Sequence, residues 1–285
     1  MFAYDRSLPL DYTEISTSKE NGYTMKDMSY LSPHGDQVPG YLVIPDTDDY
    51  PFPAVIFMHP GQGDRTTFLT EAKALASKGI VSLLISGPSI RNKSTQQLSK
   101  EQQLMQIVKE ITSIHNYIQI VVDLRRGIDL LCNLDIVDPN RLIYVGHSLG
   151  ATWGGVLAGV EERIKAFVLL AGFSRVSQWH KSSGHPIANL VRQVLSKEEF
   201  EHFIFALEPL DAIHYIKNTS NSSLFFQFAH NDEFVSREQA EAFFEAASSP
   251  KEIVWYETDH LFTNHAASYL DRVQWIFKQL ELEKQ

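Results

Sequence analysis

The chain has 285 residues, of which 44% are hydrophobic and 21% are charged, which is ordinary for a globular protein that buries its own core. Its net charge of -10 argues against nucleic acid as a partner, because a phosphate-binding surface needs an excess of Lys and Arg. Cys132 is the one cysteine, the first ten residues lack the apolar core of a signal peptide, and no apolar run reaches the length of a membrane span. We therefore expect one cytoplasmic domain over residues 1–285 with no membrane partner, and the sequence leaves its oligomeric state open.

Short apolar runs alternate with helical patterns along the chain. In chain order, the patterns predict a strand at 41–44, a strand at 54–58, a helix at 66–78, a strand at 80–85, a helical region at 99–132, a strand at 141–145, a helix at 149–160, strands at 166–170 and 224–229, a helix after the capping-box pattern 236–239, a strand at 253–256 and a helix at 265–281. Strands that alternate with helices imply βαβ crossovers. We therefore expect an α/β fold with a mostly parallel central sheet flanked by helices.

The segment 172–215 interrupts this alternation. A helical pattern runs from Pro186 to Leu195, and the sequence Ser-Lys-Glu-Glu over residues 196–199 predicts the cap of another short helix. The segment is too small for a core of its own, so we expect a helical insertion, or lid, that covers the active site. Four aromatic side chains of the insertion could line a substrate pocket or simply form its packing: Trp179, Phe200, Phe203 and Phe205.

A serine stands between two glycines at a predicted strand-to-helix junction. The sequence Gly-His-Ser-Leu-Gly over residues 146–150 follows the strand at 141–145. The turn is so tight that side chains at both glycine positions would clash, and it holds Ser148 above the sheet in a strained conformation. The helix N-terminus behind it supplies free N–H groups and partial positive charge. The pattern predicts a nucleophile elbow, and Gly154 and Gly155 within the next helix predict its close approach to the sheet.

A serine hydroxyl is a poor nucleophile unless a base takes its proton. Of the eleven histidines, His260 stands just past the strand at 253–256, at the carboxyl end where α/β sheets place their sites. We expect His260 to be the base for Ser148. His147, at the variable position of the elbow, is expected to pack beside the site without transferring protons. His265 is expected to be a helix cap or surface residue.

The base needs a carboxylate to orient it, and in this arrangement that acid follows the serine in the chain. The loop after the strand at 224–229 carries Asp232 and then Glu233. Asp232 is the first carboxylate of this loop and is the expected acid, while Glu233 is the competitor. Asp259, beside His260, is expected to lie near the site without serving as the acid.

The negative oxygen of a tetrahedral intermediate needs two backbone donors. One should be the N–H of Leu149, the residue after the nucleophile, and the other should come from the loop after the strand at 54–58. That loop starts His-Pro-Gly-Gln-Gly. Because Pro60 has no N–H, the sequence leaves Gly61 and Gln62 as candidates for the second donor.

On these residues the chain resembles the dienelactone-hydrolase-like and acyl-peptidase-like esterases of the α/β-hydrolase superfamily. The matching parts cover most of residues 25–280 and are residues 30–45, the loop at His59, residues 123–131, the elbow, Asp232 and His260. The chain departs from the family pattern at Pro60, where relatives usually carry Gly, and at residues 86–91, where relatives commonly carry an Asp-rich or Gly-rich stretch. The resemblance implies the α/β-hydrolase fold and a serine hydrolase activity.

Together these patterns predict a carboxylic ester hydrolase that cleaves a small-molecule ester or acyl substrate through an acyl-enzyme on Ser148, with no cofactor and no metal. A peptidase or a thioesterase with the same triad is an alternative, because triad geometry does not fix the leaving group. A catalytically idle binding protein of the same fold is a second alternative, against which the intact Ser148, Asp232 and His260 argue.

Overall fold

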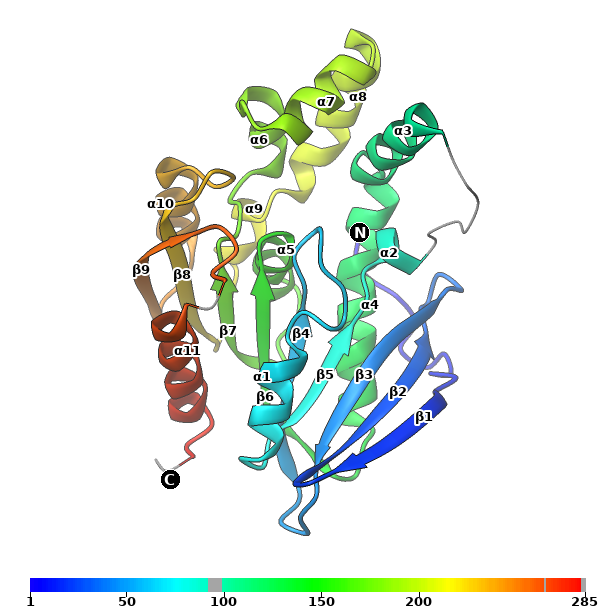
Figure 1. Cartoon of the computed structure of the whole chain (residues 1–285), viewed down its shortest axis with the longest axis vertical. Coiled ribbons are helices and arrows are strands. Elements are labelled where there is room, and N and C mark those ends of the chain that lie inside the picture. The colour runs from blue at the N-terminus through cyan, green and yellow to red at the C-terminus, as the bar shows by residue number, and fades with distance from the viewer. Residues whose placement is uncertain (92–98, 264, 283–285) are drawn as a thin grey trace.

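Nine β-strands form one sheet in the part of the chain that the computed structural model describes, which is residues 1–91, 99–263 and 265–282 (Figure 1). Their bounds are β1 Thr13–Glu20, β2 Tyr23–Leu31, β3 Gln37–Pro45, β4 Phe52–Met58, β5 Val81–Ile85, β6 Val137–His147, β7 Ile164–Leu170, β8 Ser223–Asn231 and β9 Lys251–Asp259. The order across the sheet is β1-β2-β3-β5-β4-β6-β7-β8-β9. From β5 to β9 in this order every neighbouring pair is parallel, and the pairs that join β1, β2, β3 and β5 are antiparallel. The prediction of a mostly parallel sheet is confirmed.

Helices cover both faces of this sheet (Figure 1). α1 (Leu69–Ala76) and α11 (Ala266–Gln279) pack on one face, in a core that joins Leu75, Phe225 and Ile276. On the other face lie α4 (Ile114–Cys132), α5 (Leu149–Ala158) and α10 (Arg237–Ala246). The remaining helices are α2 Pro88–Arg91, α3 Lys100–Ile111, α6 Val176–Ser182, α7 Pro186–Val194, α8 Lys197–Leu207, the 3-10 turn η1 Glu208–Leu210 and α9 Ile213–Ile216. None of the helices in the described ranges is long and apolar enough to cross a membrane.

The helical region predicted over 99–132 consists of two helices. α3 begins with the predicted capping box, in which the Ser99 hydroxyl accepts the N–H of Gln102 at 3.2 Å and the Gln102 amide oxygen accepts the N–H of Ser99 at 2.9 Å. α4 begins after Ser113, whose hydroxyl accepts the N–H of Asn116 at 3.2 Å. Ser113 has an extended backbone, with φ -74° and ψ 97°, and this non-helical residue separates α3 from α4.

The capping box predicted at Ser236 forms only in part. The Ser236 hydroxyl accepts the N–H of Gln239 at 3.3 Å, and α10 begins there. The Gln239 side chain turns away from its own helix: its oxygen accepts from the Ser174 hydroxyl and from the N–H of Arg175 at 3.0 Å, and its nitrogen donates to the Arg175 carbonyl at 3.1 Å. Since this one amide satisfies backbone groups of the segment after β7, it is not free to cap α10.

The two glycines inside α5 lie where the helix meets its neighbours. A Cβ on Gly154 would lie 2.4 Å from the Tyr144 ring of β6, and a Cβ on Gly155 would lie 2.5 Å from the Phe243 ring of α10. Both distances are too short for real side-chain contacts. The predicted close approach of this helix to the sheet is confirmed.

The segment 172–215 folds into helices α6 to α9. Figure 1 shows α6, α7 and α8 beyond the carboxyl ends of the parallel strands, and α3 lies at the same end of the sheet. Trp179 and Phe203 are buried in the main core, with Phe200 packed against it, whereas Phe205 is 77% exposed. Three of the four aromatic side chains therefore belong to packing of the insertion, and Phe205 faces solvent.

Candidate active site

Ser148 occupies the turn between β6 and α5, with φ 55° and ψ -117°. A positive φ is uncommon for a residue with a Cβ and persists only where surrounding contacts hold it. Here the Ser148 N–H donates to the Leu170 carbonyl of β7 at 2.7 Å, and the Ser148 carbonyl accepts from the N–H of Thr152 at 2.9 Å. The strand–turn–helix arrangement predicted around the serine is present.

The glycines on either side of Ser148 have no room for side chains. A Cβ on Gly146 would lie 2.5 Å from the Gly150 carbonyl, and a Cβ on Gly150 would lie 2.3 Å from the Met58 carbonyl at the end of β4. The elbow is thus pressed against the last residue of β4. This contact brings the nucleophile position beside the loop that follows β4.

A chain of hydrogen bonds joins the serine, the histidine and the aspartate that the sequence singled out. The Ser148 hydroxyl lies 2.8 Å from His260 Nε2, and His260 Nδ1 lies 2.8 and 2.9 Å from the two carboxylate oxygens of Asp232. Side chains of His260 and Asp232 are 5% and 3% exposed. If Nδ1 carries the proton and donates to the carboxylate, Nε2 is left free to accept the serine proton.

Two backbone groups hold Asp232 in place. Its Oδ1 accepts the N–H groups of Phe234 and Val235, both at 2.8 Å. Of the competing acids, Glu233 is exposed. Asp259 instead accepts the N–H of Leu261 at 3.1 Å, and among the described residues neither competitor is hydrogen-bonded to the imidazole of His260.

His147 has a contact that the sequence did not indicate. Its Nε2 lies 2.7 Å from the backbone carbonyl of His260, which can only accept, so Nε2–H is the donor. Burial, and secondarily the nearby His260, lowers the pKa of His147 to about 4, so its ring is neutral at physiological pH. The ring centroids of the two histidines are 5.4 Å apart. The expectation that His147 packs beside the site agrees with this geometry.

The buried His59 side chain holds the loop after β4 through two hydrogen bonds to backbone groups. Its Nδ1 lies 2.7 Å from the Pro60 carbonyl, and its Nε2 accepts the N–H of Gly87 at 2.9 Å, so the ring is the neutral tautomer with the proton on Nδ1. Burial lowers the pKa of His59, which favours this neutral form. The Pro60 carbonyl also accepts the N–H of Gly63 at 2.9 Å. A histidine directly after an apolar strand was the one sequence signal for this role.

The second donor candidates lie in this loop. Gly61 is next to the first residue of α5, since a Cβ on Gly61 would lie 2.8 Å from Leu149 Cδ1. Among the described residues, neither the Gly61 nor the Gln62 N–H donates a hydrogen bond. The loop after β4 and the N-terminus of α5 are therefore neighbours, and both carry N–H groups without a protein acceptor among the described residues.

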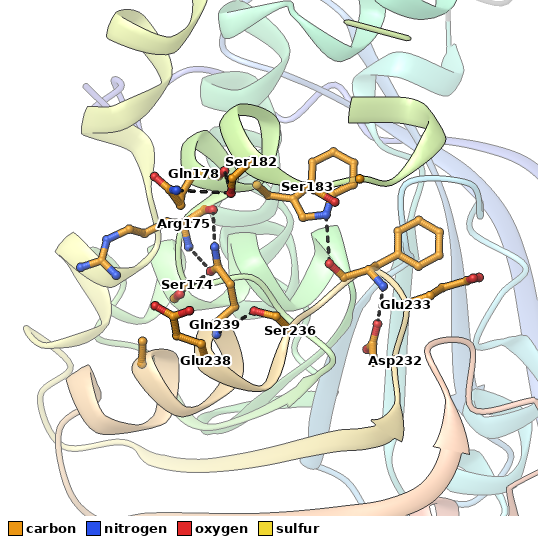
Figure 2. Close-up of a pocket in the computed structure, with 14 residues that line it drawn as sticks. Ser174, Arg175, Gln178, Ser182, Ser183, Asp232, Glu233, Ser236, Glu238 and Gln239 are labelled. Atoms are coloured by element: carbon orange, nitrogen blue, oxygen red, sulfur yellow. Dashed lines mark hydrogen bonds between the residues drawn. The ribbon is translucent and has the colours of Figure 1, made fainter. Parts of the chain in front are cut away.

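A cavity of about 570 Å³ lies beside the Asp232 loop (Figure 2). Asp232, Glu233 and Phe234 line one side of it, and residues of α6 and of the start of α10 line the other. Ser148 and His260 are not among its lining residues. Within the described ranges, no group of three or more His, Cys, Asp or Glu side chains is arranged to hold a metal ion.

Comparison with known proteins agrees with this fold. The family model described as "Acetyl xylan esterase (AXE1)" matches residues 4–278. Two acetyl xylan esterases of known structure are similar in fold. For the one from a Paenibacillus species, the TM-score is 0.74 at 18% identity, over 93% of this chain and 89% of the other. For the one from a Thermoanaerobacterium species, it is 0.72 at 15% identity, over 98% and 90%.

A Klebsiella pneumoniae protein assigned as a dienelactone hydrolase has a TM-score of 0.65 at 18% identity, over 91% of this chain and 99% of that one. At these identities the structural likeness establishes the fold alone. The search of curated proteins found no match.

Proposed function

The chain belongs to the acetyl xylan esterase (AXE1) family, and on that premise we propose that it hydrolyses esters with Ser148 as nucleophile, His260 as base and Asp232 as the orienting acid. Membership of the family makes the chain an enzyme, a carboxylic ester hydrolase that acts on small-molecule esters. One observation carries the residue assignment: the buried chain of hydrogen bonds from Ser148 through His260 to Asp232.

In the proposed mechanism the Ser148 oxygen attacks the acyl carbonyl while its proton passes to His260 Nε2. Asp232 accepts the Nδ1–H, which fixes the tautomer and stabilises the imidazolium that forms. Collapse of the tetrahedral intermediate breaks the bond to the leaving alcohol, which takes the proton from His260. A water molecule then gives a proton to His260 and attacks the acyl-enzyme, and as the acid leaves, the Ser148 oxygen takes that proton back from His260. No metal or cofactor takes part in these steps.

We assign the oxyanion contacts to the Leu149 N–H and, of the two loop candidates, to Gly61 before Gln62. Leu149 is the first residue of α5, and N–H groups of a first helical turn have no partner within the helix. The Pro60 carbonyl accepts from both His59 and Gly63, which fixes the plane of the peptide whose N–H belongs to Gly61. A donor held in advance costs no reorganisation when charge develops.

For the substrate we propose an acetyl ester of a carbohydrate. The family description and the two acetyl xylan esterases of similar fold support this class.

The experiment compares wild type with Ser148→Ala on p-nitrophenyl acetate, butyrate and octanoate, on an acetylated xylo-oligosaccharide, and on a thioester and a peptide of matched acyl group. We expect acetyl esters to be cleaved fastest and the variant to be inactive on all of them. Faster cleavage of the thioester or the peptide than of the acetyl esters would contradict this substrate class. Equal turnover of the octanoate and acetate esters would exclude a site that selects short acyl groups.

We further propose that the whole chain is one domain, that the insertion 172–215 covers the site and that the protein is cytoplasmic. The position of α6 to α8 beyond the strand ends supports the first two (Figure 1). The lone Cys132 fits a reducing compartment. Fractionation of the source cells with activity assays would test the location, and a single calorimetric unfolding transition would test the single domain.

A further inference from the structure

A stack of aromatic rings connects the insertion 172–215 to the proposed base. The Phe234 ring lies against the imidazole of His260, with centroids 4.4 Å apart and planes inclined by 29°. His185 lies against Phe234 at 4.0 Å and 35°, and Trp179 follows His185 at 5.6 Å and 36°. Trp179 and His185 belong to the insertion, whereas Phe234 follows the proposed acid in its loop. Successive ring contacts therefore connect Trp179 of the insertion to the imidazole of His260.

The backbone of Phe234 is held at both of its polar groups. Its N–H donates to the Asp232 carboxylate at 2.8 Å, and its carbonyl accepts the indole N–H of Trp179 at 2.9 Å. The cavity of about 570 Å³ adjoins the loop at these residues, opposite α6 and α10 (Figure 2). Atoms that face a void lack packing contacts on that side. Besides its packing against the main core, Phe234 is thus held by the Trp179 hydrogen bond and by the ring of His185.

We propose that Phe234 is a positioning residue for His260, held in place by Trp179 and His185 of the insertion. Its ring fixes the plane of the imidazole, and its electron-rich face stabilises the imidazolium. The imidazole is cationic only while it carries the proton of the nucleophile. The contact is therefore stronger in the transition state than in the ground state and raises kcat. This inference rests on the proposed role of His260 as base.

The test compares Phe234→Leu with Phe234→Tyr on p-nitrophenyl acetate. Leucine fills much of the space but has no π face, so we expect kcat to fall by about 2- to 30-fold with little change in KM. Tyrosine keeps the face and should retain kcat within about twofold. Without the ring the imidazolium is less stable, so the ascending limb of the pH–rate profile should move to lower pH by about 0.3 to 1.5 units in the leucine variant alone.

Neither variant changes the charged and titratable groups that already surround the imidazole, and the phenol added by Phe234→Tyr, with an ordinary pKa of about 10, stays neutral over the ascending limb. The surrounding groups are Asp232 and His147, which contact His260, His185, which lies close to it, and Glu233, which lies near His185. A matched control is Phe205→Leu, the same substitution at a 77% exposed position of the insertion, which should leave kcat and the pH profile unchanged.

Trp179→Phe tests the connection to the insertion, since it keeps a ring but removes the N–H that binds the Phe234 carbonyl. Trp179→Phe should lower kcat, as Phe234→Leu does. If Phe234→Leu does not fold, the result for Trp179→Phe tests the proposal in its place. Unchanged kcat and pH profile in a folded Phe234→Leu, or in Trp179→Phe, would overturn the proposal. So would equal losses in the leucine and tyrosine variants with no pH shift. Failure of the proposed function is distinguishable, because wild type would then show no turnover that depends on Ser148.

Discussion

Replacing Asp232 by Asn should disable the base while it preserves the shape of the site. In the structure Asp232 Oδ1 accepts two backbone N–H groups, from Phe234 and Val235. In the variant only the amide oxygen can accept these bonds, so the amide nitrogen must take the place of Oδ2, 2.8 Å from His260 Nδ1. That nitrogen donates to Nδ1, while the amide oxygen, 2.9 Å from Nδ1, already accepts two backbone N–H groups, so Nδ1 is favoured as an acceptor and the ring proton moves to Nε2. The imidazole then faces Ser148 with a donor and cannot take its proton.

In a serine protease the same tautomer defect costs about four orders of magnitude, so we expect a loss of about 10⁴-fold in kcat for Asp232→Asn. The assay is p-nitrophenyl acetate hydrolysis under saturating substrate, with thermal unfolding to show that the fold is intact. Glu233→Gln is the matched control, because Glu233 is the next carboxylate in the same loop and is exposed. It should keep kcat within about twofold. Equal losses in both variants, or a larger loss for Glu233→Gln, would refute the assignment of the acid.

Two further predictions concern stability. Burial lowers the pKa of His147 and of His180 to about 4, from 6.5, so the unfolded chain binds these protons more readily than the folded one. The stability that each neutral histidine contributes is present above about pH 6.5 and is lost as pH falls towards 4, by up to about 3 kcal/mol each. In thermal unfolding, the His180→Phe variant should therefore lose less stability over this range than wild type. An identical pH dependence of the two proteins would contradict the lowered pKa of His180. Gly150→Ala should destabilise the protein by about 3 kcal/mol or more, because its Cβ would lie 2.3 Å from the Met58 carbonyl. Gly184→Ala, whose Cβ would meet nothing within 4 Å, should be neutral in the same denaturant titration, and a neutral Gly150→Ala would disprove the tight elbow.

The sheet and the elbow could be predicted because their causes are local. Strands buried on both faces, such as β4 and β6, need continuous apolar runs, and the tight turn at Ser148 needs glycine on both sides. The resemblance to α/β-hydrolase esterases rested on the elbow together with residues 30–45, the His59 loop, residues 123–131, Asp232 and His260, and the family match confirms it. β1 had no such signal. All eight of its side chains are exposed, so it is held by backbone pairing with β2 and carries no apolar alternation.

The contacts that the sequence did not reveal join residues far apart in the chain. Gln239 matches a capping box, but its amide pairs with Ser174 and Arg175, which only the packing of α10 beside the segment after β7 brings within reach. The hydrogen bond from His147 Nε2 to the His260 carbonyl likewise forms only because tertiary packing brings the two residues together. Local patterns predict which residue can cap or donate, whereas tertiary packing decides which partner it finds.

The most direct test of the nucleophile is labelling with a fluorophosphonate, read as intact mass and then by peptide mapping. The proposed mechanism predicts one adduct per chain in wild type, located on Ser148, and none in a folded Ser148→Ala variant. It also predicts that ester turnover falls by at least about a thousandfold in that variant. An adduct that persists in Ser148→Ala, or a wild type that hydrolyses esters without being labelled, would contradict the assignment of Ser148.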